Sequence, residues 1–136
     1  MSQAVRQFLV FISLLLATVG NAKELVTTFR GADNVTTASF EVEGPWVLDW
    51  WVTSDFPAGF LIEIHMLDAS TGFQHARVLR TRHPGNGVKL FQEGGRYKFR
   101  ISSSMARWNL RVEEITQEEV ALYKPVREEK EDNVIN

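Results

Sequence analysis

The sequence predicts an all-β protein: an antiparallel β-sandwich of about eight strands, jelly-roll-like, with a short C-terminal helix or tail. Three observations support this prediction. Apolar and polar residues alternate in five segments (40–42, 46–50, 60–64, 97–101 and 108–112), which places alternate side chains on one side of an extended strand. Turn-forming residues separate these segments at short intervals, and no helical periodicity lies between them. Many short strands with these features are typical of a sandwich or a barrel.

Each expected strand is bounded by glycine, proline, asparagine, aspartate or serine, which favour turns. The expected strands cover residues 25–29, 37–43, 46–53, 60–67, 73–81, 88–92, 96–102 and 108–115. The side chains expected on the buried face are large and often aromatic: Phe40, Val42, Trp46, Leu48, Trp50, Phe60, Ile62, Ile64, Met66, Tyr97, Phe99, Ile101, Trp108, Leu110 and Val112. Burial of each large apolar side chain contributes about 1.5–3 kcal/mol, enough in sum to offset the ordering of a domain of this size.

The pattern changes after Ile115. Thr116 followed by Glu119 is a capping box, which predicts the start of a short helix that runs through Val120, Leu122 and Tyr123 and is stopped by Pro125. Residues 127–136 are strongly charged and have too few apolar side chains to fold alone. We therefore divide the chain into a sandwich domain at 23–115 and a helix and flexible tail at 116–136.

The N-terminus has the pattern of a cleaved secretory signal peptide. Arg6 precedes an apolar run over residues 8–17, and small residues lead to Ala22. An uncleaved anchor is the alternative, but the run is about half the roughly 20 residues that a spanning helix needs. We expect cleavage after Ala22, no transmembrane segment after cleavage, and a periplasmic or secreted protein.

The amino-acid composition narrows the range of chemistries and partners that we expect. The chain has no cysteine, which excludes disulfides and thiolate chemistry, and an exported protein without cysteine suits a bacterial envelope. The 15 basic and 17 acidic residues give a net charge of −2, and loss of Arg6 with the signal lowers it to −3. An acidic, exported chain makes nucleic acid an unexpected partner.

One hypothesis is a metal site. If 46–53 and 60–67 formed a hairpin, Asp49 would lie near Glu63. If 60–67 also paired with 73–81, Glu63 would face Arg77 and His65 would face His75. Glu63, His65 and His75 would then be candidate ligands for a divalent metal. The alternative, which we prefer, is a solvated face with cross-strand ion pairs and no cofactor, because a register slip of one residue would turn the whole set over.

A second hypothesis concerns a basic region that includes one irregular loop at 83–87. Its candidate ligand-binding residues are Arg77, Arg80, Arg82, His83, Lys98 and Arg100. Such a region suits an acidic polysaccharide, a phosphate-bearing surface or an acidic protein. The alternative is that Lys98 and Arg100 are simply the outward positions of an alternating strand.

Trp51 is a third candidate for ligand binding. Trp46 and Trp50 fall on the expected core side, so Trp51 should project from the opposite face, near Leu61. An outward tryptophan can stack on a sugar ring or anchor a protein partner, and it can equally pack under a loop or under the C-terminal helix.

Signatures of catalysis are missing: the sequence has neither a Gly-x-Ser-x-Gly elbow nor a phosphate-binding glycine-rich loop before a helix. We therefore expect an exported, non-enzymatic binding or interaction module whose ligand is a protein, a carbohydrate or an acidic molecule. The alternatives are a metal-dependent or hydrolytic protein that uses Glu63, His65 and His75, and an accessory subunit of an envelope assembly that docks through its tail.

Phe40–Val42 before Gly44, the 60–66 strand before Asp68, and 95–101 near the end together resemble small β-sandwich modules of bacterial exported proteins, such as prepeptidase C-terminal domains. The resemblance covers about residues 37–112. It implies a fold and transfers no functional residue, and the basic region at 77–100 departs from it.

Overall fold

The computed structural model describes residues 24–56 and 59–123 of the 136 residues. The expected signal peptide at 1–22 and most of the expected tail, from residue 124, lie outside the described residues. Within the described residues, no helix is long and apolar enough to cross a membrane.

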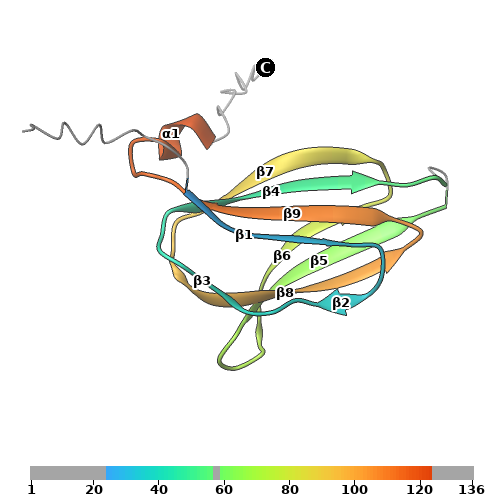
Figure 1. The fold of residues 1–136 in the computed structure, drawn as a ribbon, viewed down its shortest axis with the longest axis horizontal. Coiled ribbons are helices and arrows are strands. Elements are labelled where there is room, and N and C mark those ends of the chain that lie inside the picture. The colour runs from blue at the N-terminus through green and yellow to red at the C-terminus, as the bar shows by residue number, and fades with distance from the viewer. Residues whose placement is uncertain (1–23, 57–58, 124–136) are drawn as a thin grey trace, which may run out of the picture.

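Nine strands and one short helix make up the described chain (Figure 1). They are β1 (Glu24–Gly31), β2 (Val35–Thr36), β3 (Phe40–Val42), β4 (Trp46–Thr53), β5 (Leu61–Asp68), β6 (Gln74–Thr81), β7 (Gly85–Phe91), β8 (Gly95–Ser104), β9 (Arg107–Glu114) and α1 (Val120–Tyr123).

The strands form two packed antiparallel sheets. Sheet A has the order β1-β9-β4-β7, and sheet B has the order β2-β8-β5-β6 with β3 also paired to β8. If β2 and β3 are counted as one interrupted strand, this is an eight-stranded jelly roll, in which consecutive strands often cross from one sheet to the other. The predicted fold class is confirmed.

The hairpin that the metal hypothesis supposed between 46–53 and 60–67 does not form. In the structure β4 pairs with β7 and β9 in sheet A, while β5 pairs with β6 and β8 in sheet B. Asp49 accordingly lies opposite Val88 and Arg111 and not near Glu63. The reason is topological: in a jelly roll many sequence neighbours lie in different sheets, so adjacency in sequence does not imply pairing.

The core lies between the two sheets. Fourteen of the fifteen predicted core side chains are buried, and the remaining one, Trp50, is half-buried and packs against the core. Trp46 is fully buried, stacks on Phe91 with ring centroids 4.3 Å apart, and donates its indole N–H to the carbonyl oxygen of Glu93 at 2.9 Å. This bond satisfies the one polar group that a buried tryptophan brings into a core.

The expected strand at 37–43 is divided by Thr37. Its backbone N–H donates to the carbonyl of Phe99 at 2.8 Å, and its hydroxyl accepts from the N–H of Phe99 at 3.0 Å. The side chain thus replaces one bond of the backbone ladder. As a result β2 and β3 run along β8 as two short pieces.

The predicted C-terminal helix is confirmed as α1. The capping box forms as expected, because Glu119 N–H donates to the Thr116 hydroxyl at 3.3 Å and Thr116 N–H donates to the Glu119 carboxylate at 3.2 Å. Val120 and Tyr123 pack with Ile115 on Val47 and Leu90, which project from the outer side of sheet A. The helix therefore covers one end of that face (Figure 1).

Candidate functional site

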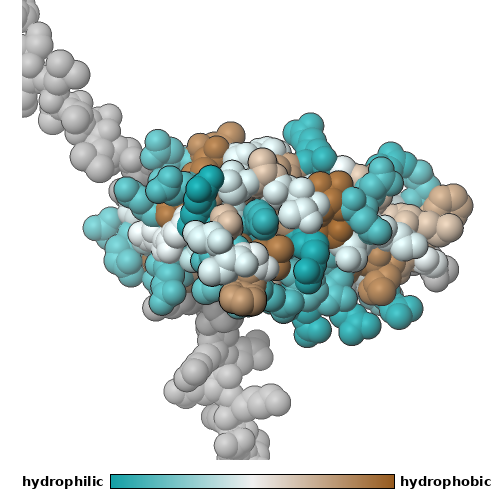
Figure 2. All heavy atoms as spheres, turned by 90° about the horizontal axis from the view of Figure 1, so that it is seen from below, coloured by the Kyte–Doolittle hydropathy of each residue, from teal (hydrophilic) through white to brown (hydrophobic). Residues whose placement is uncertain are grey.

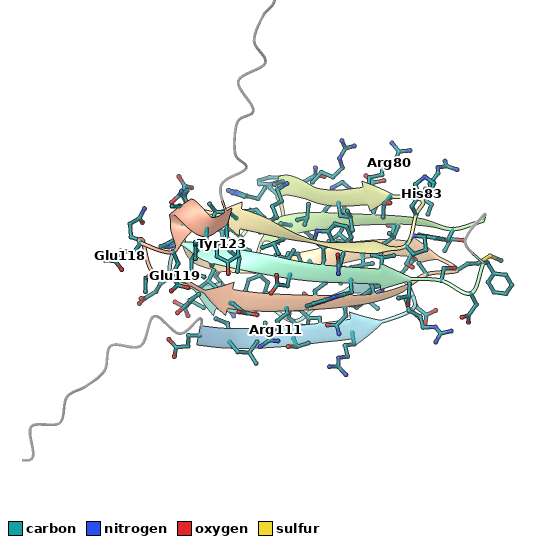
Figure 3. The ribbon with its side chains drawn as sticks, turned by 90° about the horizontal axis from the view of Figure 1, so that it is seen from above. Arg80, His83, Arg111, Glu118, Glu119 and Tyr123 are labelled. Carbon is teal, nitrogen blue, oxygen red and sulfur yellow. The ribbon has the colours of Figure 1, made fainter. Side chains whose placement is uncertain are left out.

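The outer face of sheet A carries a row of four side chains that crosses all four strands. Asn109 on β9 lies opposite Arg30 on β1 and opposite Trp51 on β4, and Trp51 lies opposite Asn86 on β7. Side chains directly opposed on one face of a sheet are about 4.5–5.5 Å apart at Cβ. Figure 3 looks onto this face, with Arg111 near its centre.

Two adjoining hollows lie along this row. One, of about 510 Å³, is lined by Arg30, Gly31, Ala32, Trp51, Thr53, Arg107, Trp108 and Asn109. The other, of about 480 Å³, is lined by Leu25, Thr28, Arg30, Trp51, Asn109 and Arg111. Because Arg30, Trp51 and Asn109 line both, the hollows form one groove over β1, β9 and β4, which we call the sheet A groove.

Trp51 projects outward, as its position in the alternation predicted, and is 39% exposed. The expectation that Trp51 lies near Leu61 is wrong, because Leu61 belongs to β5 of the other sheet. The ring instead lies between two asparagines, Asn86 and Asn109. A large apolar surface flanked by amides is therefore open to solvent at the centre of the groove.

Asn109 has an uncommon environment. Its Oδ1 atom is buried and accepts no hydrogen bond within the described chain. An unsatisfied buried acceptor costs about 1–3 kcal/mol, and such exceptions in native proteins call for an explanation. Asn109 lies beside Trp51 in both hollows, and its Oδ1 atom is turned away from solvent.

The charges along the groove are nearly balanced. Arg107 is ion-paired with Asp55, and Arg111 donates from Nε to the buried carboxylate of Glu113 at 2.7 Å. The guanidinium of Arg30 makes no hydrogen bond or ion pair with any described residue. Of the three arginines in the groove, Arg30 alone therefore has all its donors available to a ligand.

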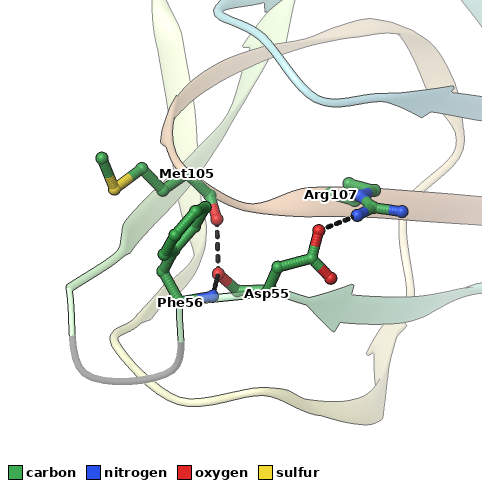
Figure 4. A network of polar contacts seen from close by, with 5 residues as sticks. Asp55, Phe56, Met105 and Arg107 are labelled. Atoms are coloured by element: carbon green, nitrogen blue, oxygen red, sulfur yellow. Dashed lines mark hydrogen bonds and ion pairs between the residues drawn. The ribbon is translucent and has the colours of Figure 1, made fainter.

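A brace holds the end of the groove far from α1 (Figure 4). The hydroxyl of Ser54 accepts from the N–H of Phe56 at 3.0 Å and donates to the carbonyl of Met105. With the ion pair between Asp55 and Arg107, these bonds join the segment after β4 to the turn between β8 and β9. A third hollow, of about 180 Å³, lies there and shares Ala32 and Arg107 with the groove.

The residues of the predicted basic region are divided among different places. Arg77, Arg80, Lys98 and Arg100 lie on strands of sheet B, whereas Arg82 and His83 lie in the turn between β6 and β7. Figure 3 shows Arg80 and His83 at one corner of the molecule, away from Arg111. The predicted basic region is therefore split between sheet B, which carries four of its residues, and the turn between β6 and β7, which carries the other two.

The predicted cross-strand pairs around the metal hypothesis are wrong. Glu63 faces Arg80 and His65 faces Arg77, because two register shifts interrupt the pairing of β5 with β6. Glu63 and His65 do meet, with 2.7 Å between Oε1 and Nε2. His75 instead lies beside the ring of Tyr97, at 5.3 Å between centroids.

Consequently Glu63, His65 and His75 do not converge. Across residues 24–56 and 59–123, no group of three or more histidine, aspartate or glutamate side chains is placed to hold a metal ion.

Sequence reasoning missed Arg30, Asn109 and Arg111 as partners of Trp51. Asn109 and Arg111 occupy the outward positions of the 108–112 alternation, so their outward orientation could be predicted from the sequence. What the sequence did not contain was the placement of β9 between β1 and β4. That long-range pairing alone brings these side chains to Trp51.

Comparisons with known proteins leave the chain without an assigned family. No protein-family model matches it, and no curated protein matches it. One similar solved structure is a carbohydrate-binding module of lichenase 5A from Cellvibrio mixtus in complex with cellotriose. It is 15% identical with a TM-score of 0.36, over 70% of this chain and 86% of that one. A similarity this low carries no inference about what this chain binds.

Proposed function

We propose that this protein is a non-enzymatic binding module that holds a carbohydrate chain in the sheet A groove. The observation that carries the proposal is the outward indole of Trp51, set between hollows that share the Asn109 amide and the free Arg30 guanidinium. Aromatic rings combined with a few polar groups are typical of small-molecule sites.

The chemistry of a sugar ring suits this arrangement. One face of a pyranose presents C–H groups, which stack on an indole, and its edge presents hydroxyl groups, which are both donors and acceptors. Asn109 and Asn86 supply amides on either side of the ring, and Arg30 supplies planar donors. The remaining arginines already have carboxylate partners, so the groove favours a ligand of low charge.

The shape favours a chain over a single sugar. Arg111 and Arg107 stand four residues apart on β9, and at about 3.3 Å per residue this separates them by roughly 13 Å. The three hollows follow one another over this length and continue beyond Arg107. Several units of an extended oligosaccharide fit along such a path, with the ring over Trp51 as the anchor.

Two parts of the proposal rest on the sequence. The pattern over residues 1–22 supports export, and the lack of catalytic motifs supports binding without turnover. N-terminal sequencing of the protein recovered outside the cytoplasm tests the first part, with Lys23 as the expected first residue. A mature protein that still begins at Met1 would contradict export with cleavage.

The binding test is a titration of the mature protein against soluble oligosaccharides from plant, fungal and bacterial cell walls, followed by tryptophan fluorescence and calorimetry. We expect at least one neutral oligosaccharide to bind and Trp51→Ala to weaken that binding tenfold or more, since stacked aromatic anchors dominate binding sites. Phe73→Ala is the matched control, because Phe73 is an exposed aromatic residue on the turn between β5 and β6. If no oligosaccharide binds, or if Trp51→Ala binds like the wild type, the proposal is wrong.

A further inference from the structure

The outer face of sheet B carries a second feature, independent of the groove. Four basic side chains project from it: Arg77 and Arg80 from β6, and Lys98 and Arg100 from β8. We call these four residues the basic face. Figure 2 views the molecule from the side on which β8 lies in Figure 1 and shows hydrophilic side chains there, with pale and hydrophobic ones between them.

A break in the strand register builds this face. Arg77 and Arg80 are three residues apart, so in a regular strand they would point to opposite sides of the sheet. Opposite them, however, stand His65 and Glu63, which are only two residues apart on β5. The extra residue on β6 is a β-bulge, a feature that re-aims side chains and often lies beside functional sites. Here it turns both arginines outward.

The cations outnumber the carboxylates on this face, where Glu63 stands opposite Arg80. Among the described residues, no side chain forms a hydrogen bond or ion pair with the side chains of Arg77, Arg80, Lys98 or Arg100. The side chain of Glu63 is bonded to His65 and forms no ion pair with Arg80. His65 stands between Arg77 and Arg100 in the sheet, so these arginines are two strand spacings apart, or about 10 Å.

From this arrangement we propose that the basic face binds an anionic polysaccharide, one that carries carboxylate or sulfate groups along its length. None of the exposed large apolar side chains of the described chain belongs to β5, β6 or β8, and Val35 on the edge strand β2 is the one that a strand of sheet B carries. Protein interfaces need an apolar centre, and membrane docking needs apolar side chains that insert between lipids. A flexible polyanion needs neither.

What separates a polysaccharide from nucleic acid is the chain as a whole and not the spacing of the cations. About six phosphates of duplex DNA span 10 Å, a number that four cations would largely match. The chain is acidic overall, with a net charge of −2, and we expect it to be exported, and both properties argue against nucleic acid. Two opposite faces would then serve two different ligands: a chain of low charge in the sheet A groove and a charged chain on the basic face.

The test compares dextran sulfate with unsulfated dextran of the same length, using the mature protein. We expect dextran sulfate alone to bind, with an affinity that falls steeply as salt rises. The double variant Arg77→Gln/Arg100→Gln should weaken this binding about tenfold and reduce its salt dependence, as expected for two exposed charge contacts. These side chains are exposed, so the variants should keep the wild-type melting temperature.

Arg96→Gln is the matched control. It also removes a cation from β8, but Arg96 lies opposite Glu41 and donates to Ser39 at 3.2 Å, so we expect less than a twofold change. Equal binding of the double variant and the wild type would overturn the proposal. Tighter binding to duplex DNA, to acidic peptides or to anionic lipid vesicles than to dextran sulfate would overturn it too. Trp51→Ala separates the two proposals, since it should leave dextran sulfate binding unchanged.

Discussion

Replacing Asn109 by leucine should make the protein more stable and at the same time weaken the binding proposed for the sheet A groove. Oδ1 of Asn109 is buried without a hydrogen-bond donor, and the residue lies between Arg30 and Trp51. Leucine has a similar shape and no polar atom, so the unsatisfied acceptor disappears. The amide that we assign to ligand recognition disappears with it.

The magnitude follows from this environment. An unsatisfied buried acceptor costs about 1–3 kcal/mol, and because Asn109 is only half-buried we expect a gain of about 1–2 kcal/mol. For a domain of 60–100 residues, 1 kcal/mol shifts the melting temperature by about 4–8 °C. The substitution should therefore raise the melting temperature by roughly 4–16 °C.

The assay is urea denaturation and calorimetry of both proteins, with oligosaccharide titration in parallel. Leucine also suits a strand better than asparagine does, by up to about 1 kcal/mol. Asn86→Leu controls for that preference, because Asn86 is an exposed asparagine across from Trp51 on β7. The stability gained at position 109 beyond the gain at position 86 measures the unsatisfied acceptor.

Two results would refute the reasoning. If Asn109→Leu is no more stable than Asn86→Leu, Oδ1 is satisfied in solution and the predicted cost of an unsatisfied acceptor is wrong. If Asn109→Leu is more stable and still binds the oligosaccharide like the wild type, the amide does not contact the ligand.

Three further predictions concern the scaffold. Trp46→Phe should lower the free energy of unfolding by about 1–3 kcal/mol in urea denaturation, since it removes the indole bond to Glu93 and part of the stack on Phe91; an unchanged midpoint would contradict this. Gly31→Ala should destabilise the fold by about 1–3 kcal/mol, because a Cβ atom there would lie 2.6 Å from Cζ2 of Trp108. Gly85→Ala is the control and should cost less than about 1 kcal/mol, because a Cβ atom there has no other atom within 4 Å. Equal costs of the two variants would contradict the close packing of Gly31 against Trp108. Hydrogen bonds from the backbone N–H groups of Thr71 and Ser70 lower the pKa of Asp68. The charged carboxylate therefore stabilises the fold above the ordinary carboxyl pKa of about 4. This contribution is lost as the pH falls through the lowered pKa. Asp68→Asn should therefore flatten the acid side of the melting-temperature profile, and an unchanged profile between about pH 2 and 5 would count against this role.

Much of the fold could be predicted because the information is local. Alternation along the chain decides which side chains of a strand share a side, and this placed fourteen of the predicted core residues correctly and turned Trp51 outward. The capping box depends only on Thr116 and Glu119, which are three positions apart in the sequence, and it forms as expected.

The candidate sites depended on information that is not local. The pairing of Glu63 with Arg80 follows from a bulge, and a bulge leaves no clear trace in hydropathy. His75 lies apart from Glu63 and His65 for the same reason, because the second register shift on β6 places it beside Tyr97. A register error of one residue is enough to move a side chain to the other face.

The sequence by itself determined an all-β sandwich, its buried side and the outward direction of Trp51, because the backbone geometry of a strand sets the two-residue period. The tertiary structure alone decided which strands became neighbours. It placed β9 between β1 and β4, so that Arg30, Asn109 and Trp51 form one row, and it separated β4 from β5 into different sheets. The physical reason is that pairing in a jelly roll minimises the exposed apolar area of the whole chain, a quantity that no single segment contains.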